Sequence, residues 1–94
     1  MSEFIWDTQK AKSNIRKHGV PFEEAITVFN DPLFVVFRSH KHSLDENRYV
    51  IIGMSDQDRL LAVSFTEAKK IRIISARELT TRERRNYEKR QKDL

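Results

Sequence analysis

The side chains of this chain that could take part in catalysis are histidines, glutamates and arginines, and they are spread along the sequence. The candidates for proton transfer are His18, His40, His42, Glu46 and Glu83. One chemistry that such a set could serve is metal-free phosphoryl transfer, which needs a base for the attacking hydroxyl, cations around the pentavalent phosphorane, and an acid for the leaving oxygen. Histidine exchanges protons near neutral pH, and arginine binds phosphate oxygens in pairs. The sequence shows no His-Asp-Ser order, glycine-rich phosphate loop or zinc-ligand spacing that would favour another chemistry.

Positive charge is concentrated near the end of the chain. Residues 1–68 hold 8 Lys/Arg and 10 Asp/Glu, whereas residues 69–94 hold 10 Lys/Arg and 4 Asp/Glu. The two parts therefore carry −2 and +6, which gives the net charge of +4. The basic part begins in a β-branched run at 71–74 and continues into a helical pattern from 81 onward, so folded elements carry it. Such a surface is typical of a protein that binds a polyanion, usually nucleic acid.

The length and composition predict one domain over residues 1–94, with a single core. Cysteine is absent, which excludes disulfides and thiolate metal sites and predicts a reducing, cytoplasmic setting. The first residues do not resemble a signal peptide, and the longest wholly apolar run, 33–37, is far too short to span a membrane. His40 and His42, followed by Asp45 and Glu46, form only a weak metal pattern. We therefore expect no membrane partner, no cofactor and no metal.

The hydrophobic pattern predicts an α+β fold in the order β-α-α-β-β-β-β-α. The expected strands are 4–6, 33–37, 48–53, 59–66 and 71–76, and the expected helices are 8–18, about 21–29 and about 81–92. Asp7 and Gly19 suit the two ends of the first helix, with Ala11 and Ile15 turned inward. Thr80 and Glu83 fit a capping box at the start of the last helix. Short turns favour antiparallel neighbours, so we expect a mainly antiparallel sheet whose strand at 33–37 is buried.

Seven segments of the sequence together suggest a known family. They are 6–11 (WDTQKA), 14–20 (NIRKHGV), 22–25 (FEEA), 31–32 (DP), 42–49 (HSLDENRY), 72–77 (RIISAR) and 83–88 (ERRNYE). In this order and spacing, over nearly the whole chain, they resemble the BrnT family of toxins from type II toxin–antitoxin modules. The resemblance implies a RelE-like fold, a ribonuclease activity that arrests translation, and a cognate BrnA-type antitoxin that binds DNA.

These observations predict an endoribonuclease site with two sets of residues. The catalytic set is His18, His42, Glu46, Arg48 and Arg77, and the RNA-binding set is Lys17, Arg59, Arg72, Arg82 and Arg85. Arg48 and Arg77 would neutralise the scissile phosphate, while a histidine would move protons. The basic segment 69–94 would also receive an acidic part of the antitoxin, in a hetero-oligomer.

Each assignment has a structural alternative. Lys17 and His18 end a helix, where they interact favourably with its C-terminal dipole. Arg77 could form a salt bridge with Glu78 or Glu46, and a charged last helix is often only solvated. For the whole chain, the alternatives are a non-catalytic nucleic-acid-binding module and a protein-interaction domain. Cleavage of RNA in EDTA separates the enzyme from both, and steep salt dependence separates nucleic-acid binding from protein docking.

Overall fold

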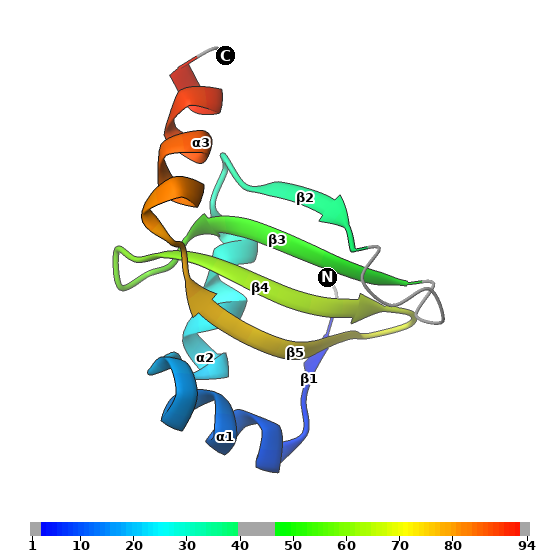
Figure 1. Ribbon diagram of the computed structural model, residues 1–94. Helices are drawn as coiled ribbons and strands as arrows, with labels where there is room; N and C mark the ends of the chain where they lie inside the picture. Colours follow the sequence, from blue (N-terminus) through cyan, green and yellow to red (C-terminus); the bar gives the residue numbers. More distant parts are fainter. Residues whose placement is uncertain (1–2, 40–46, 93–94) are drawn as a thin grey trace.

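The computed structural model of the chain describes residues 3–39 and 47–92, and Figure 1 shows their arrangement. The elements in these ranges are β1 (Phe4–Ile5), α1 (Thr8–His18), α2 (Phe22–Ala25), the 3₁₀ helix η1 (Ile26–Asn30), β2 (Val35–Arg38), β3 (Arg48–Met54), β4 (Leu60–Glu67), β5 (Ile71–Glu78) and α3 (Thr81–Lys92). The predicted α+β class and the order of the strands are confirmed. No helix in the described part of the chain is long and apolar enough to cross a membrane.

The sheet is mixed, with the strand order β1-β5-β4-β3-β2. Strands β2 to β5 form an antiparallel meander, as the short turns after β3 and β4 predict. Strand β1 pairs with β5 in parallel, with Phe4 opposite Ile71 and Ile5 opposite Arg72. The expectation of a mainly antiparallel sheet holds for the meander but missed this parallel pairing, because pattern and turn length give no information on partners so far apart in sequence.

The first helix has the predicted bounds and caps. The Asp7 side chain accepts hydrogen bonds from the N–H groups of Gln9 and Lys10, at 2.8 and 3.1 Å. Gly19 ends the helix in the left-handed region, at φ 69°, which a residue without Cβ adopts at little cost. The expected inward position of Ile15 is wrong, since this side chain is 47% exposed and Asn14 is the buried residue of the helix.

The second N-terminal helix differs from the single amphipathic α-helix that was expected. One α-helical turn, α2, passes directly into the 3₁₀ helix η1. The Thr27 hydroxyl donates to the carbonyl of Glu24 at 2.7 Å, a side-chain bond of the kind that competes with helical backbone bonds. The apolar face nevertheless turns inward as predicted, because Phe22 and Ala25 are fully buried.

The strand predicted at 33–37 lies one to two residues later and is not buried. It is the outermost strand, β2, and the exposed fractions are 52% for Leu33, 46% for Phe34, 43% for Val36 and 48% for Phe37. A continuous apolar run is typical of a strand covered on both faces, but at the edge of a sheet the same run stays accessible.

The main core fills the space between the sheet and the N-terminal helices, with α2 and η1 behind the sheet and α1 along its β5 side (Figure 1). We call the opposite side the open face. It carries the side chains of Val35, Phe37, Val50, Ile52, Ala62, Ser64, Arg72, Ser75 and Arg77. A smaller apolar cluster, with Leu60, Leu79 and Tyr87, fixes α3 at one end of this face. The open face is therefore only partly covered, and its β5 side is accessible.

Candidate functional site

The side chain of Asn14 fixes α1 against β5. Its amide nitrogen donates to the carbonyls of Ala76 and Val20, at 2.8 and 2.9 Å, and its oxygen accepts from the N–H of Ala76 at 3.1 Å. Strand β1 pairs only with the first residues of β5, so beyond Arg72 the outer backbone edge of β5 needs other partners. Asn14 satisfies that edge at Ala76 as a neighbouring strand would. The position of α1, and of every side chain on it, is thereby set relative to β5.

A groove runs along the seam between α1 and β5. Its volume is about 170 Å³, and its lining residues are Lys10, Ser13, Asn14, Lys17, His18, Ile74 and Ser75. The structure therefore brings Lys17 and His18, both predicted from sequence, next to β5. Both lie in the last turn of α1, so their favourable interaction with the helix C-terminus and a role in the groove are compatible.

Arg77 lies two residues after Ser75 on the same face of β5, and Glu83 at the start of α3 holds its guanidinium. Nη1 donates to Oε1 of Glu83 at 2.7 Å and Nη2 donates to Oε2 at 2.8 Å. Nη1 also donates to the carbonyl of Glu78 at 3.1 Å. The suggested salt bridge to the Glu78 side chain is therefore replaced by a two-point pair with Glu83.

Glu83 also belongs to the predicted capping box, which is confirmed. The N–H of Thr80 donates to Oε1 of Glu83 at 2.8 Å, and the N–H of Glu83 donates to the Thr80 hydroxyl at 3.2 Å. The hydrogen bonds from Arg77 lower the pKa of Glu83 to about 2, against the raising effect of burial, and the Thr80 backbone adds to the lowering. Glu83 is thus a carboxylate at neutral pH. It orients Arg77, whose side chain stays 42% exposed and can still meet a ligand.

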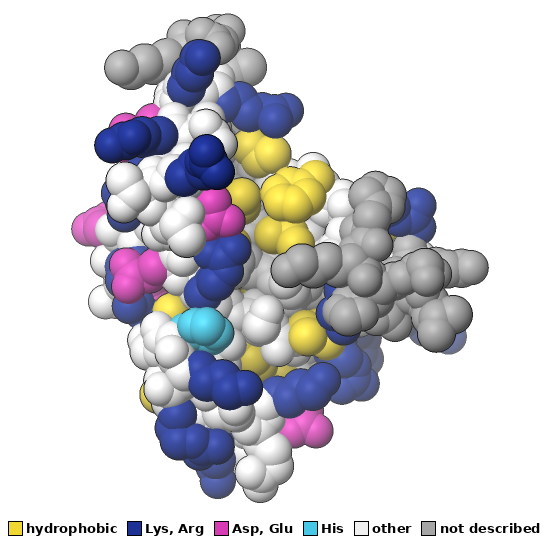
Figure 2. All heavy atoms as spheres, viewed as in Figure 1, with side chains coloured by type: hydrophobic (Ala, Val, Ile, Leu, Met, Phe, Trp, Pro, Cys, Tyr) yellow, Lys and Arg dark blue, Asp and Glu magenta, His cyan; other side chains and the backbone are white. Residues whose placement is uncertain are grey.

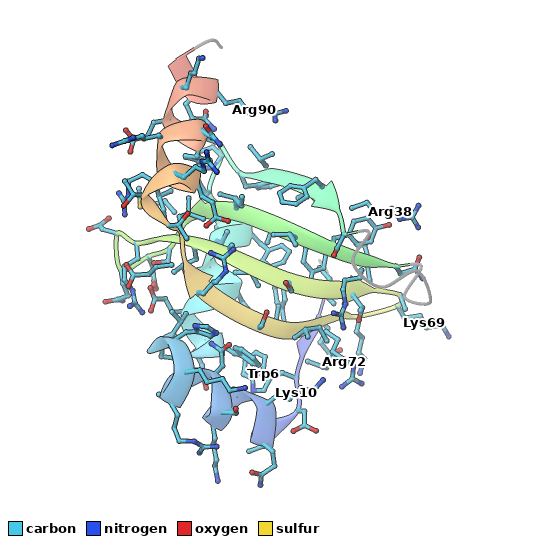
Figure 3. The ribbon with its side chains drawn as sticks, in the orientation of Figure 1. Trp6, Lys10, Arg38, Lys69, Arg72 and Arg90 are labelled. Carbon is cyan, nitrogen blue, oxygen red and sulfur yellow. The ribbon has the colours of Figure 1, made fainter. Side chains whose placement is uncertain are left out.

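Further cations lie on the open face and on α3. The strand registers align Arg48, Thr66 and Arg72 in one row across β3, β4 and β5. Figure 3 shows Lys10 and Arg72 projecting on the α1 side of the sheet, far from Arg90 on α3. Figure 2 shows basic side chains over α3 and along the α1 side of this view. Arg82 and Arg85 are exposed on α3, as an RNA-binding role requires.

Comparison with known proteins decides the family. A family model described as the ribonuclease toxin BrnT of type II toxin–antitoxin systems matches residues 6–83. The chain belongs to the BrnT family. A crystal structure of the Brucella abortus ribonuclease toxin BrnT is also similar, with 25% sequence identity and a TM-score of 0.68. That match covers 86% of this chain and 100% of the Brucella chain. A search of curated proteins gave no match.

As a BrnT toxin, the chain is a ribonuclease of a type II toxin–antitoxin system, with an RNA target and an antitoxin partner. This confirms the resemblance and decides for the enzyme over the two non-catalytic alternatives. The family match extends from just before α1 to Glu83, so it includes the α1–β5 groove and the pair formed by Arg77 and Glu83. Arg85 lies beyond the matched residues.

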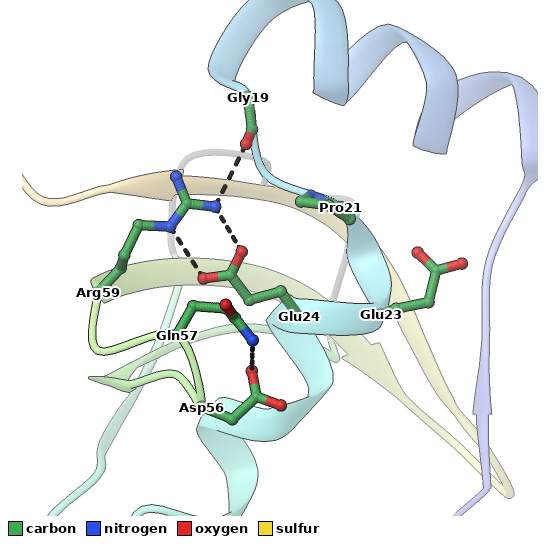
Figure 4. A pocket seen from close by; sticks show the side chains of 7 residues that line it. All are labelled: Gly19, Pro21, Glu23, Glu24, Asp56, Gln57 and Arg59. Atoms are coloured by element: carbon green, nitrogen blue, oxygen red, sulfur yellow. Dashed lines mark hydrogen bonds and ion pairs between the residues drawn. The ribbon is translucent and has the colours of Figure 1, made fainter.

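In this BrnT toxin, Arg59 is part of the structural framework. Figure 4 shows it in a depression of about 690 Å³, lined by Gly19, Pro21, Glu23, Glu24, Asp56, Gln57 and Arg59. Both carboxylate oxygens of Glu24 accept from Arg59, one of them from Nε at 2.9 Å, and the Gly19 carbonyl accepts at 3.2 Å. Glu24 also accepts from the Ser55 hydroxyl at 2.7 Å. The bonds from Arg59 lower the pKa of Glu24 despite its burial.

The guanidinium of Arg59 is thus occupied by the turns that it joins, and we leave it out of the RNA surface. His42 and Glu46, like His40, lie outside the described residues, and their roles stay predictions. Within the described part of the chain, no group of three or more His, Cys, Asp or Glu side chains is placed to hold a metal ion.

Sequence reasoning missed how two residues, Asn14 and Glu83, position this site. Asn14 was visible as a polar residue between two positions expected to face inward, Ala11 and Ile15, and that break in the pattern was the available signal. Glu83 was found as a cap, but its second role, orienting Arg77, depends on where α3 turns after β5.

Proposed function

We propose that this toxin cuts single-stranded RNA without a metal ion at the surface formed by α1, the open face of β5 and the start of α3. The observation that carries the proposal is the convergence of two different groups on β5. His18 lines a groove with Ser75, and Arg77, two residues further along the same face, is held at two points by Glu83. A proton-transfer group and a fixed cation are two of the components that this chemistry needs.

In the proposed reaction, neutral His18 accepts the proton of the 2′-hydroxyl, whose oxygen attacks the adjacent phosphorus. Arg77 faces the negative charge that develops on the phosphoryl oxygens, and Glu83 keeps it in place before the substrate arrives. The bond to the 5′-oxygen breaks, and that oxygen takes up a proton to leave as a 5′-hydroxyl. The other product ends in a 2′,3′-cyclic phosphate. His42, Glu46 and Arg48 stay as candidates for the second proton transfer and for further charge neutralisation.

The remaining cations would hold the RNA backbone on either side of the cut. Lys17 lines the α1–β5 groove, Arg72 is exposed at the start of β5, and Arg82 and Arg85 are exposed on α3. Phosphate contacts of this kind fix the position of a strand without reading its bases. In the cytoplasm, cleavage of messenger RNA would arrest translation. A BrnA-type antitoxin in a hetero-oligomer would silence the toxin.

The test is cleavage of a short single-stranded RNA by the purified toxin in EDTA, with the ends of the products identified. We expect cleavage with 2′,3′-cyclic phosphate ends, and a large loss of rate in His18→Ala. Arg16→Ala is the matched control, because Arg16 lies in the same last turn of α1 but does not line the groove. A requirement for an added divalent ion would contradict the metal-free mechanism. Cleavage by His18→Ala at the rate of the parent would contradict the role of His18.

A further inference from the structure

The outer edge of β2 is unusual for a protein that must stay soluble. Its first three side chains and the two just before it form the apolar run LFVVF at residues 33–37, between Pro32 and Arg38, and four of the five are large apolar groups at least 43% exposed. Proteins normally protect an edge strand with charges, proline or a bulge, because the edge offers its backbone to any extended chain. Here the apolar stretch has such residues only at its two ends, which indicates a strand that receives a partner.

The backbone register shows which groups this edge offers. The N–H of Ser39 donates to the carbonyl of Arg48 at 2.9 Å, so these two residues form a hydrogen-bonded pair of the antiparallel ladder. Such pairs alternate with pairs that are not bonded, and Phe37 is therefore bonded to β3, whereas Val36 is not. The N–H and C=O of Val36 point away from the sheet, ready for another strand.

A groove beside this edge would take side chains from such a strand. It lies between α3 and the β2 side of the open face, and its volume is about 250 Å³. The lining residues are Val35, Phe37, Ile52, Glu83, Asn86, Tyr87 and Arg90. Figure 2 shows hydrophobic side chains between α3 and the sheet, with basic side chains on α3 next to them. The floor of the groove is apolar, and its α3 rim carries Arg90 together with the Glu83 carboxylate, which is paired with Arg77.

We propose that an extended segment of the antitoxin, both acidic and apolar, adds to β2 as a sixth strand and places apolar side chains in this groove. The acidic side chains would face Arg90, which lines the groove beside Asn86 and Tyr87. This inference rests on the antitoxin partner that family membership implies. It goes beyond the prediction that the basic segment 69–94 receives an acidic part of the antitoxin, because it specifies the backbone edge, the groove and the mode of binding.

Two other occupants fit the surface less well. RNA could use Arg90 and stack on Phe37 or Tyr87, but it has no peptide backbone to pair with the outward N–H and C=O of Val36. A second copy of this chain would bring another basic α3 toward the first across the joined edges, and each copy has a net charge of +4. An acidic segment of the antitoxin would instead neutralise the positive charge of α3, and charge therefore favours it over a second copy of this chain.

The site also explains inhibition. Three strand spacings, roughly 14 Å, separate β2 from β5. An antitoxin anchored on the β2 edge needs only to extend across the open face to cover Arg77 and the α1–β5 groove.

The experiment uses the full toxin and the purified product of the neighbouring gene, once that product has been shown to relieve toxicity. Val36→Pro removes the outward N–H while the ladder to β3 is kept, and Val36→Thr is the matched control that retains it. Phe37→Ser and Arg90→Glu test the groove floor and its cationic rim. We expect Val36→Pro to raise the Kd roughly three- to tenfold, as the loss of one backbone hydrogen bond predicts. The two groove variants should each raise it about tenfold or more, and Val36→Thr should leave it near that of the parent.

A second measurement reports on the backbone directly. Hydrogen exchange at the amide of Val36 should slow markedly when the antitoxin binds, because a new strand covers that N–H. An unprotected amide would overturn the sixth-strand geometry even if the groove variants weakened binding. Unchanged affinity in Val36→Pro, Phe37→Ser and Arg90→Glu would overturn the site itself.

Two further measurements test whether RNA or a second copy of this chain occupies the β2 edge instead. RNA cleavage by Val36→Pro without antitoxin should match that of the parent, and a loss would assign the edge to RNA. If sedimentation shows that the parent is a dimer that Val36→Pro dissociates, with antitoxin affinity unchanged, the occupant is a second copy and the proposal is wrong. His18→Ala should bind antitoxin normally whether or not it cuts RNA, so failure of the catalytic proposal is distinguishable from failure of this one.

Discussion

Two arginine–glutamate pairs, on opposite sides of the sheet, show how differently the same chemistry can be used. Arg59 and Glu24 lie on the helix-covered side, and the Glu24 side chain is only 7% exposed. Arg77 and Glu83 lie at the open face, where their side chains are 42% and 34% exposed. In the first pair, the guanidinium of Arg59 is hydrogen-bonded to both carboxylate oxygens of Glu24 and to the carbonyl of Gly19. The second leaves an oriented guanidinium accessible, so a carboxylate partner by itself does not mark an arginine as structural.

The largest expected effect is the loss of the buried pair. Arg59→Ala should lower the free energy of unfolding by about 3 kcal/mol, because Glu24 stays buried without its cation. The measurement is urea denaturation, with the cleavage rate corrected for the folded fraction. Arg84→Ala, a change at an exposed position of α3, is the control and should fall within about 0.5 kcal/mol of the parent. A loss below about 1 kcal/mol would show that Arg59 is not a structural anchor.

The opposite pattern is expected at the open face. Arg77→Ala should reduce cleavage by roughly 100-fold, as the removal of one fixed transition-state donor does. It should change the free energy of unfolding by at most about 1 kcal/mol, since the pair is partly exposed. Arg77→Lys should recover only part of the rate, because lysine cannot bind two phosphate oxygens in a fork. The measurement is the initial rate on a short RNA, beside urea denaturation of each variant.

An Arg77→Ala toxin that cuts at the parent rate would remove this arginine from the site. Equal losses of stability in Arg59→Ala and Arg77→Ala would remove the contrast between the two pairs.

The exposed arginines of α3 give a smaller effect that depends on salt. Reversing Arg82 and Arg85 to glutamate should weaken RNA binding about tenfold at low salt and flatten its salt dependence, because two phosphate contacts are lost. The matched control reverses Lys12 and Arg16, which are exposed on α1 and do not line the groove. The measurement is RNA affinity at several salt concentrations. An unchanged salt slope would place the RNA backbone elsewhere.

The smallest expected effect is a pH dependence carried by Glu83. Its pKa of about 2 in the folded protein lies below its ordinary value of 4.5. Its stabilising contribution is therefore present above pH 4.5 and is lost as the pH falls toward 2. Solvent screening limits that contribution to at most about 1 kcal/mol. Urea unfolding of the parent and of Glu83→Gln, compared at about pH 6 and about pH 3, should show a weaker decline for the variant. If the free energy of unfolding declined equally in the parent and in Glu83→Gln, the assignment of this pH dependence to Glu83 would be wrong.

The sequence predicted those parts of the fold that depend on neighbouring residues. The caps at Asp7, Gly19 and Thr80 follow from contacts within a few positions, and the helix at 8–18 has the predicted bounds. Burial of β2 was predicted wrongly, because apolar content does not tell whether a strand is central or outermost. The parallel pairing of β1 with β5 was missed because nothing local signals a partner at the other end of the chain.

The same limit applies to the site residues, because local sequence patterns do not show which distant side chains come together. His18 and Arg77 were chosen by residue type, by position at element ends and by the family resemblance, and the structure places both beside the open face of β5. The partner of Arg59 is Glu24, 35 residues away, so no local pattern could separate this arginine from those proposed to bind RNA. The family itself came from the joint match of seven segments. Composition and charge alone would have predicted only a protein that binds a polyanion.

The bond between Asn14 and Ala76 has a consequence for the order of assembly. The two residues are 62 positions apart, whereas the meander from β2 to β5 is built from hairpins that are much closer in sequence. Contacts between distant residues form late, because a long loop must close first. During synthesis, α1 can therefore reach its final position only after β5 has been made. The α1–β5 groove is therefore among the last parts of the fold to form, after the hairpins of the meander.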